Sequence, residues 1–308
     1  MLSSFGAASA DVKPTRALGT TAQDLHWLAA HGLPIPVAWV LDATAFELVL
    51  SRTGADRAVA EMRWRLTGLW DDLTAVERVM RSLEERRVSV ARALRGAPLP
   101  DALGRRLEEL VLRETLWMIR TSPVFEDQVI DIPEFSLAGV RSGQALWDGV
   151  RQVWASTYRR RVLEHCAQHD APVPSMAIVL HPIDPISVRD RSGTVYSRAP
   201  WSGVRGPGVQ AIFGVLQNGR GRGYGMVCGR WVSMRRPLPM PEWAVVIPPG
   251  GGTVRTPYPS GEPLNGDEAT RLVELAKGAA EARGRPVALD FIWPAGGEPV
   301  LLRMREEE

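Results

Sequence analysis

The beginning of the chain alternates between helical and extended spacing of apolar and polar residues. Apolar residues fall on one face from about residue 20 to 31, and Gly32 with the prolines after it predicts the end of this helix. A short apolar strand is expected over residues 37–41. Asp42 follows it directly and is expected to cap the next helix, because its carboxylate can accept a hydrogen bond from a free amide of the first turn.

Residues 55–113 have the period of helices and carry many charges, with a break at residues 96–100, where glycine and proline occur. This stretch is predicted to be a helical insertion. It contains large apolar residues, among them Trp64, Leu69 and Trp70. We expect these to lie in the core, with an interface as the alternative.

Strands and two further helices are expected in the rest of the chain. Residues 142–169 are predicted to form one long amphipathic helix and residues 266–283 another. Residues 236–266 are rich in proline and glycine and are expected to be irregular. The predicted strands are residues 115–120, 176–181, 193–197, 286–293 and 299–304.

Composition excludes several classes of protein. The chain has 308 residues, 45% of them hydrophobic and 23% charged, as in ordinary globular proteins of one or two domains. No apolar run approaches the roughly 18 residues of a membrane span. The start of the chain lacks the basic region of a signal peptide, and two cysteines form no metal-binding spacing or disulfide framework. We therefore expect a cytoplasmic protein that does not bind a membrane.

The charge balance argues against nucleic acid as a partner, because the net charge is only +2. The 37 basic residues are nearly all arginines, and the lysines are Lys13 and Lys277. A cation that binds phosphate in this chain is therefore expected to be an arginine.

Residues suited to bind phosphate follow the predicted strand over residues 115–120. The segment supplies one guanidinium, two hydroxyls and two carboxylates, from Arg120, Thr121, Ser122, Glu126 and Asp127. Guanidinium and hydroxyl groups suit a phosphate chain. A predicted Ser-Leu-Ala-Gly turn ends at Gly139, where glycine would let the backbone approach the ligand closely. The alternative is that Arg120 is a surface or ion-pair arginine.

This segment resembles the Arg-Ser-Ser-Ala-Thr-Ala-Glu-Asp and Ser-Phe-Ala-Gly stretches of one family of ATP-binding domains. The family comprises phosphoenolpyruvate synthase, pyruvate phosphate dikinase and rifampicin phosphotransferase. The resemblance implies an α/β, two-lobe, ATP-grasp-like fold with ATP and Mg²⁺ as ligands. It implies an N-terminal α/β lobe over residues 1–180, which includes the helical insertion, and a C-terminal lobe of mostly antiparallel sheet over residues 181–308.

The resemblance also implies which residues contact the nucleotide. Phosphate contacts would come from Arg120, Thr121, Ser122 and Gly139, and His181 takes the place of a glutamine near the adenine. Four further positions carry over from motifs of the family. Thr21 replaces the phosphate-binding lysine, Gln217 replaces a glutamate, Arg303 replaces a glutamine, and Arg305 matches the family arginine.

A magnesium ligand is implied at Asp290, which stands where the family has a glutamate, with Glu126 or Asp127 as further ligands. The resemblance extends over roughly residues 16–305 and leaves no room for the phosphohistidine and acceptor domains of the dikinases. It therefore implies a phosphotransferase component that needs a protein partner carrying those domains. Arg120, Arg305 and Asp290 would line one cleft around the triphosphate.

The departures from the family motifs support an alternative. Thr21, Gln217 and Arg303 all stand where the family has functional groups, and Pro182, beside the adenine position, has no N–H to donate. The alternative is a degenerate relative that binds a protein or acts as a scaffold.

Overall fold

The computed structural model describes residues 2–5, 16–69, 72–111, 115–125, 135–141, 143–201, 206–215, 222–227, 230–234 and 241–307. Their fold class is mixed α/β, as predicted. The chain divides into two compact units, and each is described by itself. Of the described residues, the first unit contains 2–5, 16–23 and 38–183, and the second contains 24–37 and 184–307.

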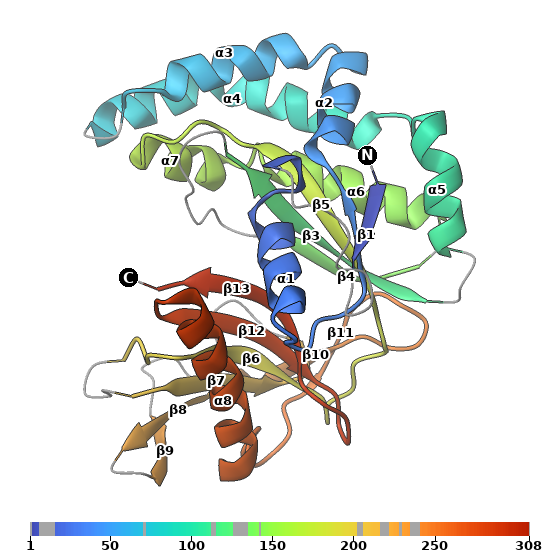
Figure 1. Cartoon of the computed structure of the whole chain (residues 1–308). Coiled ribbons are helices and arrows are strands. Elements are labelled where there is room, and N and C mark those ends of the chain that lie inside the picture. Colours follow the sequence, from blue (N-terminus) through green and yellow to red (C-terminus); the bar gives the residue numbers. More distant parts are fainter. Residues whose placement is uncertain are drawn as a thin grey trace. The chain divides into compact units, whose positions relative to one another are not determined.

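An antiparallel sheet forms the centre of the first unit (Figure 1). Its described strands follow the order β1-β2-β5-β3-β4. Their bounds are β1 Leu2–Phe5, β2 Ala38–Leu41, β5 Ser175–Ile183, β3 Leu116–Val124 and β4 Ser136–Val140. The two long strands β3 and β5 pair over nine residues each and are buried along most of their length. This central pair is the frame on which most of the predicted phosphate-binding residues lie.

Helices supply the rest of the first unit's core. Their bounds are α2 Ala43–Arg52, α3 Asp56–Leu66, α4 Leu73–Gly96, α5 Asp101–Val111, α6 Gly143–Ser156 and α7 Arg160–Gln168. Helix α6 packs against the sheet and against α4 and α5, and it buries Trp147 and Trp154 completely. The predicted cap is confirmed, since the Asp42 carboxylate accepts from the Thr44 amide. The expectation for Trp64 is wrong, because this side chain is 78% exposed on α3. Leu69 packs partly buried against the core, and Trp70 lies outside the described residues.

Two predicted elements of this unit are wrong in extent. The helix predicted over residues 142–169 is two helices, because the amides of Thr157, Tyr158 and Arg159 bond to carbonyls three residues back and close the last turn of α6. Strand β3 does not end at Arg120 but continues to Val124. The predicted Ser-Leu-Ala-Gly turn is strand β4, paired with β3. Pairing with neighbouring strands satisfies the backbone groups of both segments.

The second unit contains a larger antiparallel sheet with one long helix (Figure 1). Its described strands follow the order β13-β12-β6-β7-β8-β9. Their bounds are β6 Arg191–Tyr196, β7 Gly208–Phe213, β8 Arg222–Val227, β9 Arg230–Met234, β12 Val287–Trp293 and β13 Val300–Glu306. A separate pair, β10 Trp243–Val246 and β11 Val254–Pro257, lies within the stretch that we expected to be irregular, so that expectation is wrong in part.

Helix α8 (Gly266–Arg283) has the predicted bounds and packs against β6, β7 and β12. Asn265 and Glu268 form a capping box at its start, and Gly284 ends it in the left-handed conformation. Near the start of the chain lie a short 3-10 helix, Arg16–Leu18, and α1, Thr20–Ala30. None of the helices in the described ranges combines the length and apolar character needed to cross a membrane.

Candidate functional site

A row of polar side chains crosses the sheet of the second unit. Asp290 on β12 lies opposite Thr194 on β6, and Thr194 lies opposite Gln210 on β7. Arg303 on β13 lies opposite Asp290 on the other side. Directly opposed residues in adjacent strands project from the same face of a sheet. The register therefore places an amide, a hydroxyl, a carboxylate and a guanidinium in one line.

Three members of this row are buried although they are polar, and the fourth, Arg303, is partly exposed. Gln210 is 3% exposed, Thr194 5% and Asp290 9%. Their neighbours along β12, Leu289 and Phe291, are buried apolar residues and by alternation project from the opposite face. We assign that apolar face to α8, whose buried residues are also apolar. A buried polar row on the face away from α8 calls for an explanation, because the transfer of polar groups from water is unfavourable.

Hydrogen bonds fix the carboxylate at the centre of the row. The Thr194 hydroxyl donates to Asp290 Oδ1 over 2.6 Å, and Arg305 Nη2 donates to the same oxygen over 3.1 Å. The strand register shifts between Asp290 and Phe291, an irregularity that re-aims side chains and is common beside functional sites. The hydrogen bonds found for this carboxylate in the described part of the protein all involve Oδ1. Its Oδ2 atom is therefore the oxygen that can serve a ligand.

The side chains around Asp290 fit a magnesium ion that is held by one protein carboxylate and otherwise by phosphate and water. Among the described residues, no cluster of three or more His, Cys, Asp or Glu side chains could hold a metal by itself. Mg²⁺ often takes only one or two protein carboxylates and completes its shell with phosphate oxygens and water. Asp290 is suited to that role. Arg305, whose side chain is 30% exposed, is suited to a phosphate oxygen.

The predicted phosphate-binding residues of the first unit lie within the sheet. Arg120 is buried on β3, with Ser136 of β4 and Val179 of β5 beside it. The Thr121 amide donates to the Phe135 carbonyl over 3.2 Å, and the Thr121 hydroxyl accepts from the Phe135 amide over 3.3 Å. Thr121 therefore joins β3 to the start of β4.

Ser122 has a structural task in this unit. Its hydroxyl donates to the Leu18 carbonyl over 2.8 Å and accepts from the Ala22 amide over 3.0 Å. The Ala22 amide belongs to the first turn of α1, and Gly19 at the cap position has no side chain to satisfy it. Ser122 thus caps a helix that lies 100 residues earlier in the chain.

The remaining predicted residues are distributed as follows. Thr21 is buried on α1, His181 is buried on β5, and Gly139 has a positive φ of 76° within β4. Glu126, Asp127 and Gln217 lie outside the described residues. Each unit therefore gathers a subset of the predicted residues: the first brings Arg120, Thr121, Ser122, Gly139 and His181 onto one sheet, and the second brings together Asp290, Arg303 and Arg305. That both groups line one cleft stays a prediction.

Two members of the polar row, Thr194 and Gln210, were not identified from the sequence. A single threonine in a strand is common, and its apolar neighbours give no sign of a ligand. The signal that could have found them is register: once β6 is paired with β12, Thr194 must oppose Asp290.

Comparison with known proteins gives no further assignment, since no protein-family model matches this chain and no curated protein matches its sequence.

Proposed function

We propose that this protein binds MgATP and is the nucleotide-binding component of a phosphotransferase, with a two-lobe ATP-grasp-like fold. The observation that carries the proposal is the buried polar row of the second unit. Its central carboxylate has one oxygen fixed by Thr194 and Arg305 and the other available to a cation. A fixed carboxylate beside guanidinium groups matches the needs of a metal-bound triphosphate.

The residues of the row would act by position and charge. Asp290 would hold Mg²⁺ through Oδ2, and Thr194 would keep the carboxylate in one orientation. Arg305 would neutralise a phosphate oxygen while it remains hydrogen-bonded to Asp290. Such preorganised groups need no reorganisation when negative charge moves along the phosphate chain. The sequence resemblance adds Arg120 as a further cation and Arg303 as a further contact.

The phosphoryl acceptor in this proposal belongs to a protein partner that carries a histidine. The proposal rests on the sequence resemblance to the dikinase ATP-binding domains. Incubation with γ- or β-labelled ATP and a candidate partner tests it directly. An acid-labile phosphohistidine on the partner is the expected product, and label that stays in ATP would contradict this part of the proposal.

Nucleotide binding is tested by the melting temperature with and without MgATP. A ligand at ten times its dissociation constant stabilises the native state by about 1.4 kcal/mol. For a protein of this size the melting temperature should then rise by about 2 °C. Asp290→Asn keeps the size of the side chain but removes the charge, so this variant should lose most of the shift. The matched control is Asp184→Asn, at an exposed aspartate of the same unit.

A second function is favoured by the contacts of the first unit. The Ser122 hydroxyl already donates to one backbone carbonyl and accepts from one backbone amide, and the Thr121 hydroxyl accepts from the Phe135 amide. These side chains serve the fold as it stands. Together with Thr21 at the lysine position, this supports a protein-binding module that no longer uses nucleotide. An unchanged melting temperature at millimolar MgATP would favour this second function and contradict the first.

A further inference from the structure

Three consecutive arginines occupy the start of helix α7 in the first unit. Arg159 is the residue before the helix, and Arg160 and Arg161 are its first two residues. The first turn contains no acidic residue. Cations at a helix N-terminus are unfavourable, because the unpaired amides there already give this end a partial positive charge. Violations of such a local rule are typical of functional sites.

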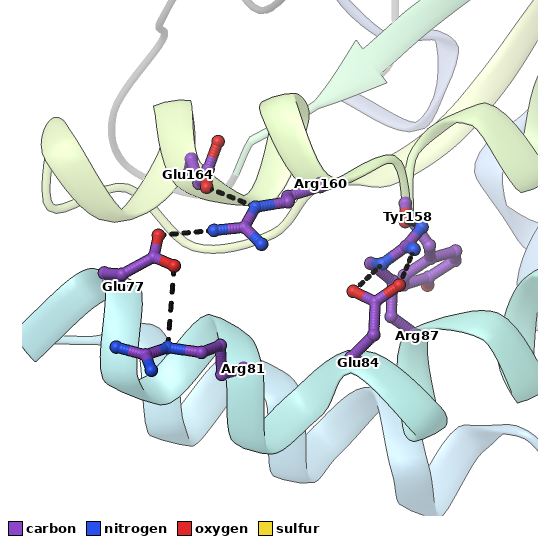
Figure 2. A network of polar contacts seen from close by, with 7 residues as sticks. All are labelled: Glu77, Arg81, Glu84, Arg87, Tyr158, Arg160 and Glu164. Carbon is purple, nitrogen blue, oxygen red and sulfur yellow. Dashed lines mark hydrogen bonds and ion pairs between the residues drawn. The ribbon is translucent and has the colours of Figure 1, made fainter.

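Only the middle arginine of the three is neutralised. Figure 2 shows the Arg160 guanidinium between two carboxylates, with Nε at 2.7 Å from Glu164 and Nη2 paired with Glu77. The same figure shows Arg81 beside Glu77, and Arg87 paired with Glu84. Glu77, Glu84 and Glu164 are therefore already paired with arginines other than Arg159 and Arg161.

Arg159, Arg161 and Arg95 have no such carboxylate. Among the described residues, no hydrogen bond or ion pair involves these three side chains, which we name the arginine cluster. Arg95 lies in the last turn of α4, which packs against α7. Burial lowers the pKa of the Arg159 guanidinium, and the positive charges of Arg161 and Arg95 lower this pKa further. Arg159 is thus close enough to both Arg161 and Arg95 for their charges to repel its own.

An aromatic ring orients one member of the cluster. The guanidinium carbon of Arg159 lies 3.9 Å from the centre of the Phe135 ring. A guanidinium over the face of an aromatic ring is attracted by the electrons of the ring, so this contact restrains the side chain. Phe135 is in turn held by its two backbone hydrogen bonds to Thr121 on β3. Arg159 is therefore restrained by its contact with Phe135 and is not a freely moving surface arginine.

We propose that Arg95, Arg159 and Arg161 bind the phosphate group of a small soluble anion. A guanidinium matches two phosphate oxygens with parallel hydrogen bonds, and a multiply charged phosphate would offset the repulsion among the three side chains. The cluster lies wholly in the first unit, whereas the polar row around Asp290 lies in the second. The two proposals therefore stand independently.

Isothermal titration with inorganic pyrophosphate in the absence of magnesium tests this site, with inorganic phosphate as a second probe. The double variant Arg159→Gln/Arg161→Gln should bind pyrophosphate at least tenfold more weakly than the wild type. Arg57→Gln, at an exposed arginine of the same unit, removes a charge elsewhere and should leave the affinity unchanged. Asp290→Asn should also leave it unchanged, which separates this site from the proposed nucleotide site.

A second measurement separates an anion site from a structural role. Without ligand, the double variant should melt at the same or a higher temperature than the wild type, because it relieves like-charge repulsion at the helix start. Arg161→Gln alone, at an exposed position, should show the same sign. Equal pyrophosphate affinity in the double variant and the wild type, or a lower melting temperature of Arg161→Gln without ligand, would overturn the proposal.

Discussion

Replacing Ser122 by alanine is the sharpest test of how the first unit is assembled. The substitution removes one hydroxyl that makes two hydrogen bonds, one to the Leu18 carbonyl and one from the Ala22 amide. Ser122 is completely buried, and Leu18 and Ala22 are buried as well. Water therefore cannot replace either hydrogen bond without a local opening of the structure.

The expected loss of stability follows from these contacts. A buried hydrogen-bonding group left without a partner costs about 1–3 kcal/mol, and the loss of a helix cap costs about 0.5–2 kcal/mol. The two effects overlap at the Ala22 amide, so we expect Ser122→Ala to lower the free energy of unfolding by about 3 kcal/mol. With a urea dependence of about 3 kcal/mol per molar, the unfolding midpoint should fall by about 1 M.

The assay is urea unfolding followed by far-ultraviolet circular dichroism. The control is Ser51→Ala, at an exposed serine of α2 in the same unit, which should change the free energy of unfolding by less than about 0.5 kcal/mol. If Ser122→Ala is as stable as this control, the hydroxyl does not hold the start of α1. Ser122 would then be open to the role in phosphate binding that the sequence resemblance implies.

Four further predictions follow from other positions. Gly193→Ala should destabilise the second unit by several kcal/mol, because its Cβ would lie 1.9 Å from the Gln210 carbonyl oxygen, and urea unfolding measures this loss. Gly278→Ala is the opposite case, since nothing lies within 4 Å of a Cβ there, and the higher helix propensity of alanine should add about 1 kcal/mol in the same assay. Burial raises the pKa of the Cys166 thiol to about 12, so this thiol stays neutral in the folded state while it ionises above about pH 9 in the unfolded state. Its contribution to stability is then complete below pH 9 and falls by about 1.4 kcal/mol per pH unit above it, a slope that should be smaller in Cys166→Ala when unfolding is measured between pH 8 and 11. Tyr158→Phe should leave the melting temperature unchanged or raise it, because the Tyr158 hydroxyl is buried without a hydrogen-bond partner among the described residues; a clear decrease would show that a water molecule satisfies it.

Features set by neighbouring residues were accessible from the sequence. Asp42 caps its own helix two residues on, and α8 begins and ends where its pattern predicts. The signals for such elements lie within one or two turns of the chain: a capping side chain, a helical period and a terminating glycine. Asp290 and Arg305 were singled out by the family resemblance of the last two strands, and the fold joins these two side chains by a hydrogen bond.

Features that depend on a partner distant in the sequence were decided by the fold. Ser122 looked like a phosphate ligand, yet its hydroxyl is engaged by backbone groups about a hundred residues away. The length of β3 depended on its pairing with β5, and the alignment of Thr194 with Asp290 depended on strand register. A local sequence pattern predicts whether a segment forms a helix or a strand. It does not predict which hydrogen-bonding groups from distant parts of the chain will contact that segment. For this protein, the amino-acid sequence determined which functional groups each candidate site contains. The tertiary structure decided which of these groups are engaged in hydrogen bonds within the fold, because their partners are distant in the sequence.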